Sequence, residues 1–78
     1  MFFGYNTANN EVIGFYNLSD RNRLVGVNND IVAICNTRAA DIMRDAIWSI
    51  DPSFTTDMWG TAEDVYHWYI TRSNLYAN

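Results

Sequence analysis

The sequence predicts an α+β fold, in which an antiparallel meander of three to four strands is followed by one or two helices packed on one face of the sheet. The first half alternates short β-branched and aromatic segments with turn residues, and the apolar spacing becomes helical after Cys35. No repeat or linker composition divides the chain. One compact domain over residues 1–78 is therefore expected, with 49% hydrophobic residues to form its core.

Four segments of the first half have the residue types of strands, and turn-forming residues separate them. They are residues 2–5 (FFGY), 11–18 (EVIGFYNL), 24–27 (LVGV) and 31–35 (IVAIC), with turns at 7–10, 19–22 and 28–30. Gly14 and Gly26 lie inside two of these segments, where each indicates a bulge or the close approach of a helix. Because residues 31–35 are apolar without alternation, this strand is expected at the centre of the sheet or covered on both faces.

The apolar spacing after Cys35 is that of an amphipathic helix. Asn36 or Thr37 is expected to cap this helix. Pro52 is expected to end it, because a helix rarely continues into the residue before a proline. The predicted buried stripe consists of apolar residues three and four positions apart, namely Ala39, Ile42, Met43, Ala46, Ile47 and Ile50.

A second helix is predicted from residue 61 onwards. Thr61 and Asp64 have the spacing of a capping box, although the acid is shorter than the preferred Glu or Gln. Four apolar residues then share one helical face, namely Val65, Tyr66, Tyr69 and Ile70. Residues 65–70 (VYHWYI) also have strong strand propensity, so a further strand is the competing interpretation. The acidic first turn favours the helix.

The composition limits the chemistry that this chain can perform. With one cysteine, Cys35, and one histidine, His67, it cannot form an internal disulfide or the usual zinc site, so no metal or cofactor is expected. Cys35 just before a helix would suit a nucleophile, but no catalytic partner is evident, so we expect a buried structural cysteine and no enzyme. The start, MFFGYNTANNEV, has neither a basic leader nor a long apolar run, which predicts a cytoplasmic protein without a membrane anchor.

The formal net charge of −4 is concentrated in the second half of the chain. Residues 1–40 contain equal numbers of acidic and basic residues, whereas Arg44 is the sole cation of residues 41–64. The carboxylates of that segment are Asp41, Asp45, Asp51, Asp57, Glu63 and Asp64. Their spacing is not that of a calcium loop, and a solvated acidic face is expected. Such a field repels phosphates, so direct nucleic-acid binding is not expected.

Trp48 is predicted to lie on the polar side of the first helix. On a helical wheel it falls almost opposite the apolar stripe and beside Asp41 and Asp45. Either residues 53–60 or another element folds over the indole, or the indole stays partly exposed as a binding hot spot. In the second case carboxylates and aromatic rings together suit a basic protein surface. The predicted partner-binding residues are Asp41, Asp45, Trp48, Asp57, Trp59, Glu63 and Asp64.

In format the chain resembles the small anti-CRISPR and anti-restriction inhibitors of phages and mobile elements, because it is short, acidic, of sheet-plus-helix pattern and without a catalytic motif. The resemblance extends over this general design and involves no diagnostic motif. It implies stoichiometric binding to a bacterial defence nuclease or its guide complex, inside the host cell. The alternative interpretation is a small homo-oligomeric structural or accessory subunit, in which Trp48 and an exposed sheet edge meet a second copy.

Overall fold

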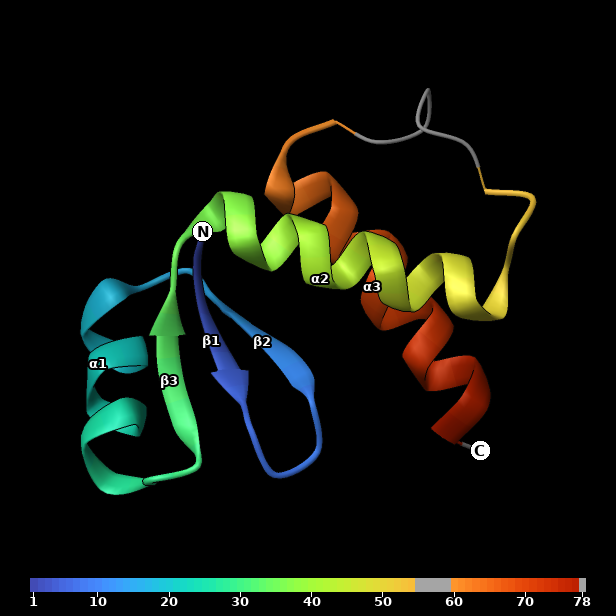
Figure 1. Ribbon diagram of the computed structural model, residues 1–78. Helices are drawn as coiled ribbons and strands as arrows, with labels where there is room; N and C mark the ends of the chain where they lie inside the picture. Colours follow the sequence, from blue (N-terminus) through green and yellow to red (C-terminus); the bar gives the residue numbers. More distant parts are fainter. Residues whose placement is uncertain (55–59, 78) are drawn as a thin grey trace. The chain divides into compact units, whose positions relative to one another are not determined.

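The computed structural model describes residues 1–54 and 60–77 of the chain. Its elements follow in the order β1 (Phe2–Asn6), β2 (Glu11–Phe15), α1 (Leu18–Val27), β3 (Ile31–Ile34), α2 (Asn36–Ile50) and α3 (Ala62–Ala77), as Figure 1 shows. The chain divides into two compact units, Met1–Ala39 and Ala40–Asn78, which we call the sheet unit and the helical unit. The predicted α+β class is confirmed, and the single compact domain over residues 1–78 stays a prediction.

β1 is the central strand of a three-stranded antiparallel sheet with the order β2-β1-β3. Asn6 of β1 lies opposite Glu11 of β2 and Ile31 of β3, which defines the register of both ladders. The predicted turn at residues 7–10 joins β1 to β2, and the N–H of Asn10 donates to the carbonyl of Asn6 at 2.8 Å. Asn10 has a φ of 62°, a left-handed conformation that asparagine tolerates better than most residues.

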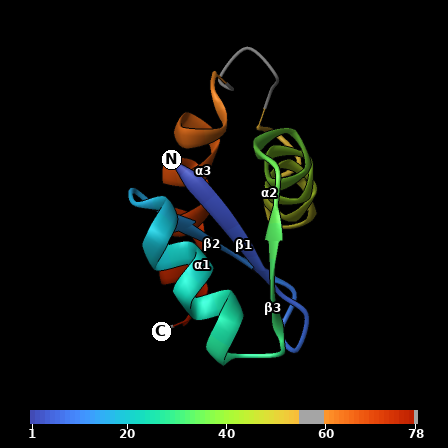
Figure 2. The same ribbon diagram turned by 90° about the vertical axis from the view of Figure 1, so that its left-hand side faces the viewer.

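The segment between β2 and β3 is a helix, so the predicted turn at 19–22 and strand at 24–27 are wrong. Because β2 and β3 both run antiparallel to β1, they are parallel to each other, and the chain must cross the length of the sheet between them. α1 makes this crossover and packs against the strands (Figure 2), with the guanidinium of Arg21 5.9 Å from the ring of Phe2. Gly26, predicted to lie in a strand and to mark a bulge or the close approach of a helix, belongs to α1 and has open space beside it.

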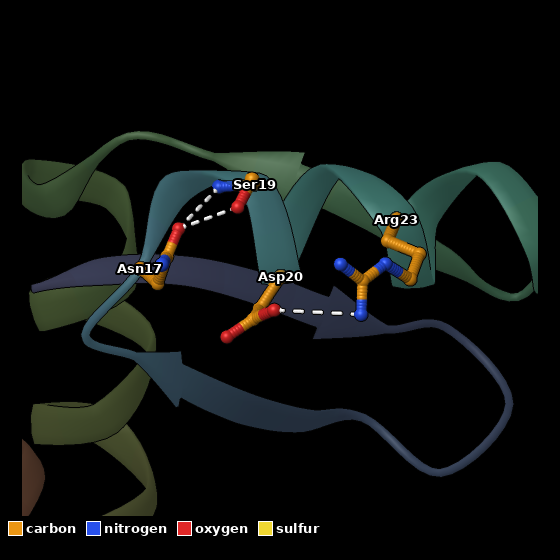
Figure 3. A network of polar contacts seen from close by, with 4 residues as sticks. All are labelled: Asn17, Ser19, Asp20 and Arg23. Carbon is orange, nitrogen blue, oxygen red and sulfur yellow. Dashed lines mark hydrogen bonds and ion pairs between the residues drawn. The ribbon is translucent and has the colours of Figure 1, made fainter.

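α1 has a side-chain cap at its start, and none of its described residues is fully buried. The side-chain oxygen of Asn17 accepts hydrogen bonds from the Ser19 N–H at 2.9 Å and the Ser19 hydroxyl at 2.6 Å, as Figure 3 shows. Asp20 in the first turn forms an ion pair with Arg23 at 3.6 Å. All of α1 lies within the described residues, and none of its side chains is buried. The cap therefore adds to the stability that the half-buried Leu24 and Val25 give this helix.

β3 lies at an edge of the sheet, so the predicted central or doubly covered position of residues 31–35 is wrong. Ile31 and Ile34 are buried, whereas Val32 and Ala33 are exposed. Cys35, expected to be buried, is exposed directly after the strand. An unbroken apolar segment can therefore have buried ends and an exposed middle.

The first predicted helix is confirmed, but its buried residues differ in part from the predicted stripe. The Ala39 N–H donates to the carbonyl of Cys35 at 3.0 Å, so α2 begins at Asn36, slightly before the predicted caps. It ends at Ile50, before Pro52 as predicted. Ile50 itself is 42% exposed and does not belong to the stripe, whose buried members are Ala39, Ala40, Met43 and Ile47.

α3 confirms the second predicted helix and excludes a strand at residues 65–70. Val65 and Tyr69 are buried, and Tyr66 and Ile70 on the same face are half-buried. Spacings of three and four residues between these positions are those of one helical face, as the sequence predicts.

Replacing the cap residue tests whether local bonds hold α1. Asn17→Ala removes both hydrogen bonds to Ser19 and should lower the free energy of unfolding by about 1 kcal/mol. Urea unfolding followed by far-UV circular dichroism measures the change. The matched control is Asn22→Ala, inside the exposed part of the same helix. It removes only exposed hydrogen bonds from the Arg21 guanidinium, and alanine has the higher helix propensity, so the change in stability should be small. Equal effects of the two variants would contradict the capping role.

Candidate functional site

Four polar or aromatic residues of α2 are each three and four positions from two others of the set, and so share one side of the helix. They are Asp41, Arg44, Asp45 and Trp48. Asp41 and Asp45 are exposed, and the half-buried Arg44 forms an ion pair with Asp41. Arg44 therefore offsets the charge of Asp41, whereas Asp45 has no ion pair to any described residue. The predicted grouping of Trp48 with these carboxylates agrees with this spacing.

Trp48 is half-buried, and a residue of the following segment holds it. Its indole N–H donates a hydrogen bond to the backbone carbonyl of Phe54. The two outcomes considered for Trp48 are thus each met in part, because Phe54 contacts the indole and part of the ring stays accessible. A ring held in one orientation loses less conformational freedom when a partner binds it.

A tight turn after α2 brings Phe54 back to Trp48. The N–H of Phe54 donates to the carbonyl of Asp51 at 3.1 Å, and Pro52 occupies the second position of this turn, which suits its fixed φ. The hydroxyl of Ser53 donates to the carboxylate of Asp51 at 2.7 Å. Asp51, one of the carboxylates of the acidic segment, therefore has a structural role in this turn.

Trp68 of α3 is a second partly exposed indole, and sequence reasoning missed it. Its ring lies edge-on to the buried Phe54, with centroids 5.3 Å apart, and the residue is 41% exposed. Both Trp48 and Trp68 thus contact Phe54 within the helical unit. A carboxylate stands about one turn before each indole, Asp45 in α2 and Asp64 in α3. The spacing from Asp64 to Trp68 is the sequence feature from which Trp68 could have been predicted as a site residue.

Asp64 has a second role as half of the predicted capping box, which is confirmed. Its carboxylate accepts from the N–H of Thr61 at 3.0 Å, and its own N–H donates to the Thr61 hydroxyl at 3.3 Å. Gly60 leaves room for this carboxylate, because a Cβ at residue 60 would lie 2.3 Å from its oxygen. Asp64 stays exposed, and Glu63 beside it is half-buried.

Asp57 and Trp59, also predicted as partner-binding residues, lie outside the described residues. Within residues 1–54 and 60–77, no group of three or more His, Cys, Asp or Glu is arranged to hold a metal ion. In the same ranges no helix combines the length and apolar character needed to cross a membrane. Comparison with protein-family models, with curated proteins and with solved structures found no match to this chain.

The bond from Trp48 to Phe54 can be removed while an aromatic ring is kept. Trp48→Phe removes the hydrogen bond from the indole N–H to the Phe54 carbonyl and should lower the free energy of unfolding by about 1 kcal/mol. Tyr16→Phe, at an aromatic residue that is 75% exposed, should change it by less than about 0.5 kcal/mol. Denaturant unfolding compares the two variants, and equal stability would show that Phe54 does not hold the indole.

The capping box predicts different consequences for two neighbouring acids. Asp64→Ala should lower the free energy of unfolding by about 1 kcal/mol, because the N–H of Thr61 loses its acceptor. Glu63→Ala, in the same helical turn, should have a smaller effect, since it removes only a favourable charge at the helix start. Thermal and urea unfolding of the two variants measure the difference. A larger loss for Glu63→Ala would contradict this assignment.

Proposed function

We propose that this chain is a non-enzymatic binding protein that inhibits or regulates a nucleic-acid-handling protein complex by covering one of its basic surfaces. The contact surface is the acidic aromatic face, which we define as Asp41, Asp45, Trp48, Glu63, Asp64 and Trp68. One observation carries the proposal. Each helix of the helical unit places a carboxylate about one turn before a partly exposed indole, and both indoles contact Phe54.

The two kinds of side chain contribute differently to such an interface. Tryptophan is enriched at binding hot spots, because its large ring buries much apolar area and loses few rotatable bonds. Trp48 is partly fixed by its bond to Phe54 before any partner arrives, which lowers the entropic cost of binding. Exposed carboxylates such as Asp45 accelerate the encounter with a positively charged surface and disfavour acidic partners.

The sign and size of the charge support a particular kind of target. Protein surfaces that bind nucleic acid are basic because they neutralise phosphates. A chain with a formal net charge of −4 is attracted to them and repelled by nucleic acid itself. This charge is modest, and Arg44 offsets part of it within the acidic aromatic face. Occupation of one local basic site therefore suits the chain better than imitation of a whole duplex.

Charge reversal tests the proposal once a target is in hand. The wild-type chain is used to capture proteins from its native host, and mass spectrometry identifies those retained. Binding of the purified target is then measured by calorimetry for Asp41→Lys/Asp45→Lys. We expect the dissociation constant to rise about tenfold or more, and less so at high salt, because steering and pairing by the carboxylates are lost.

The matched control is Ala8→Lys/Glu11→Lys/Tyr16→Lys, which changes the net charge equally through three exposed residues of the sheet unit. It should leave the dissociation constant close to that of the wild type, and far-UV circular dichroism verifies that both variants fold. The captured protein should also release its nucleic acid when the wild-type chain is added. Normal binding by folded Asp41→Lys/Asp45→Lys, or a target without a nucleic-acid site, would overturn the proposal.

A further inference from the structure

The outer edge of β3 presents backbone groups to which the described residues offer no partner. The N–H of Thr7 donates to the carbonyl of Asp30 at 2.8 Å, just before β3. Because bonded and non-bonded pairs alternate along an antiparallel ladder, Val32 and Ile34 direct their backbone groups to β1. Ile31, Ala33 and Cys35 therefore direct theirs away from β1.

Some of these outward groups are already bonded within the chain. The N–H of Ile31 donates to the carbonyl of Asn28 at 3.1 Å, and the carbonyl of Cys35 accepts from Ala39 at 3.0 Å. The groups left over are the carbonyl of Ile31, both backbone groups of Ala33 and the N–H of Cys35. Across the part of the chain that the structure describes, no hydrogen bond reaches any of them.

The side chains of this edge do nothing to prevent strand pairing. Natural edge strands are short or covered, or they carry a charged residue, a proline or a bulge that blocks the approach of another strand. β3 is short, with four residues, but it reads Ile-Val-Ala-Ile and contains no charged residue, proline or bulge. Val32 is 41% exposed and Ala33 is exposed, so its middle presents apolar surface together with the open backbone groups.

We propose that a second copy of this chain pairs with β3 in the antiparallel direction, about a two-fold axis that passes beside Ala33. In this register each Ala33 N–H donates to the Ala33 carbonyl of the other copy. Each Cys35 N–H donates to the Ile31 carbonyl of the other copy, and these are the groups that the single chain leaves open. The pairing also places Val32 beside Ile34 of the second copy.

Charge favours the antiparallel direction over the parallel one. Asp30 stands just before β3, and Arg38 stands after it in the first turn of α2. Antiparallel pairing brings Asp30 of one copy toward the end of β3 where the other copy carries Arg38, whereas parallel pairing would bring like charges together. This dimer goes beyond the proposed function and does not rest on it, because it uses the sheet unit and does not involve the acidic aromatic face.

Sedimentation equilibrium from micromolar to millimolar concentration tests the pairing in the full chain. The wild type should pass from monomer to dimer as its concentration rises. Ala33→Lys and Ala33→Glu each place like charges directly opposite one another at the axis, so each alone should weaken the dimer about tenfold or more. An equimolar mixture of the two should dimerise again, because lysine then faces glutamate. Ala8→Lys, in the exposed turn between β1 and β2, is the control and should dimerise like the wild type.

Hydrogen exchange of the wild type supplies a measurement that needs no variant. The amide protons of Ala33 and Cys35 should exchange more slowly as the protein concentration rises. A wild type that stays monomeric throughout this range overturns the proposal. Dimers of unchanged strength in Ala33→Lys, or a dimer in which the amides of Ala33 and Cys35 gain no protection, also overturn it.

Discussion

The central position of β1 constrains the path of the whole sheet unit. A strand with antiparallel neighbours on both sides forces those neighbours to run parallel to each other. The short turn at residues 7–10 suffices between β1 and β2, but no short turn can connect β2 to β3. Residues 18–27 must therefore span the sheet, and a helix does so with its backbone groups bonded internally. The same arrangement puts β3 at an edge and leaves its outer backbone groups open.

The sequence predicted the elements whose signals are local. The helical spacing of α2, the stop before Pro52 and the capping box of Thr61 and Asp64 depend only on residues a few positions apart, and all three are confirmed. The helix α1 was missed because the same residue types form turns and helix caps. Asn17 and Asp20 suit either role, and the decisive influence, the pairing of β1 on both sides, lies outside the segment.

In the acidic aromatic face, too, the part that depends on local spacing was predicted, and the part that depends on contacts with a later segment was missed. A helical wheel suffices to place Trp48 beside Asp41 and Asp45. The backbone carbonyl of Phe54 that holds Trp48, and the ring contact between Phe54 and Trp68, depend on how the chain turns after α2. Periodicity describes one helix at a time and carries no information on contacts between a helix and a later segment.

The helix α1 joins two strands while burying none of its own side chains. Its ten residues rise about 15 Å at 1.5 Å per residue, close to the span of about 13 Å expected for a four-residue strand. Most of its exposed residues can therefore be exchanged without loss of core packing, provided that the cap and the helical propensity are kept. Insertions or deletions are restricted much more, because a change of length would displace the start of β3 relative to β1. In this segment the length of the helix constrains the fold more than the identity of its exposed residues does.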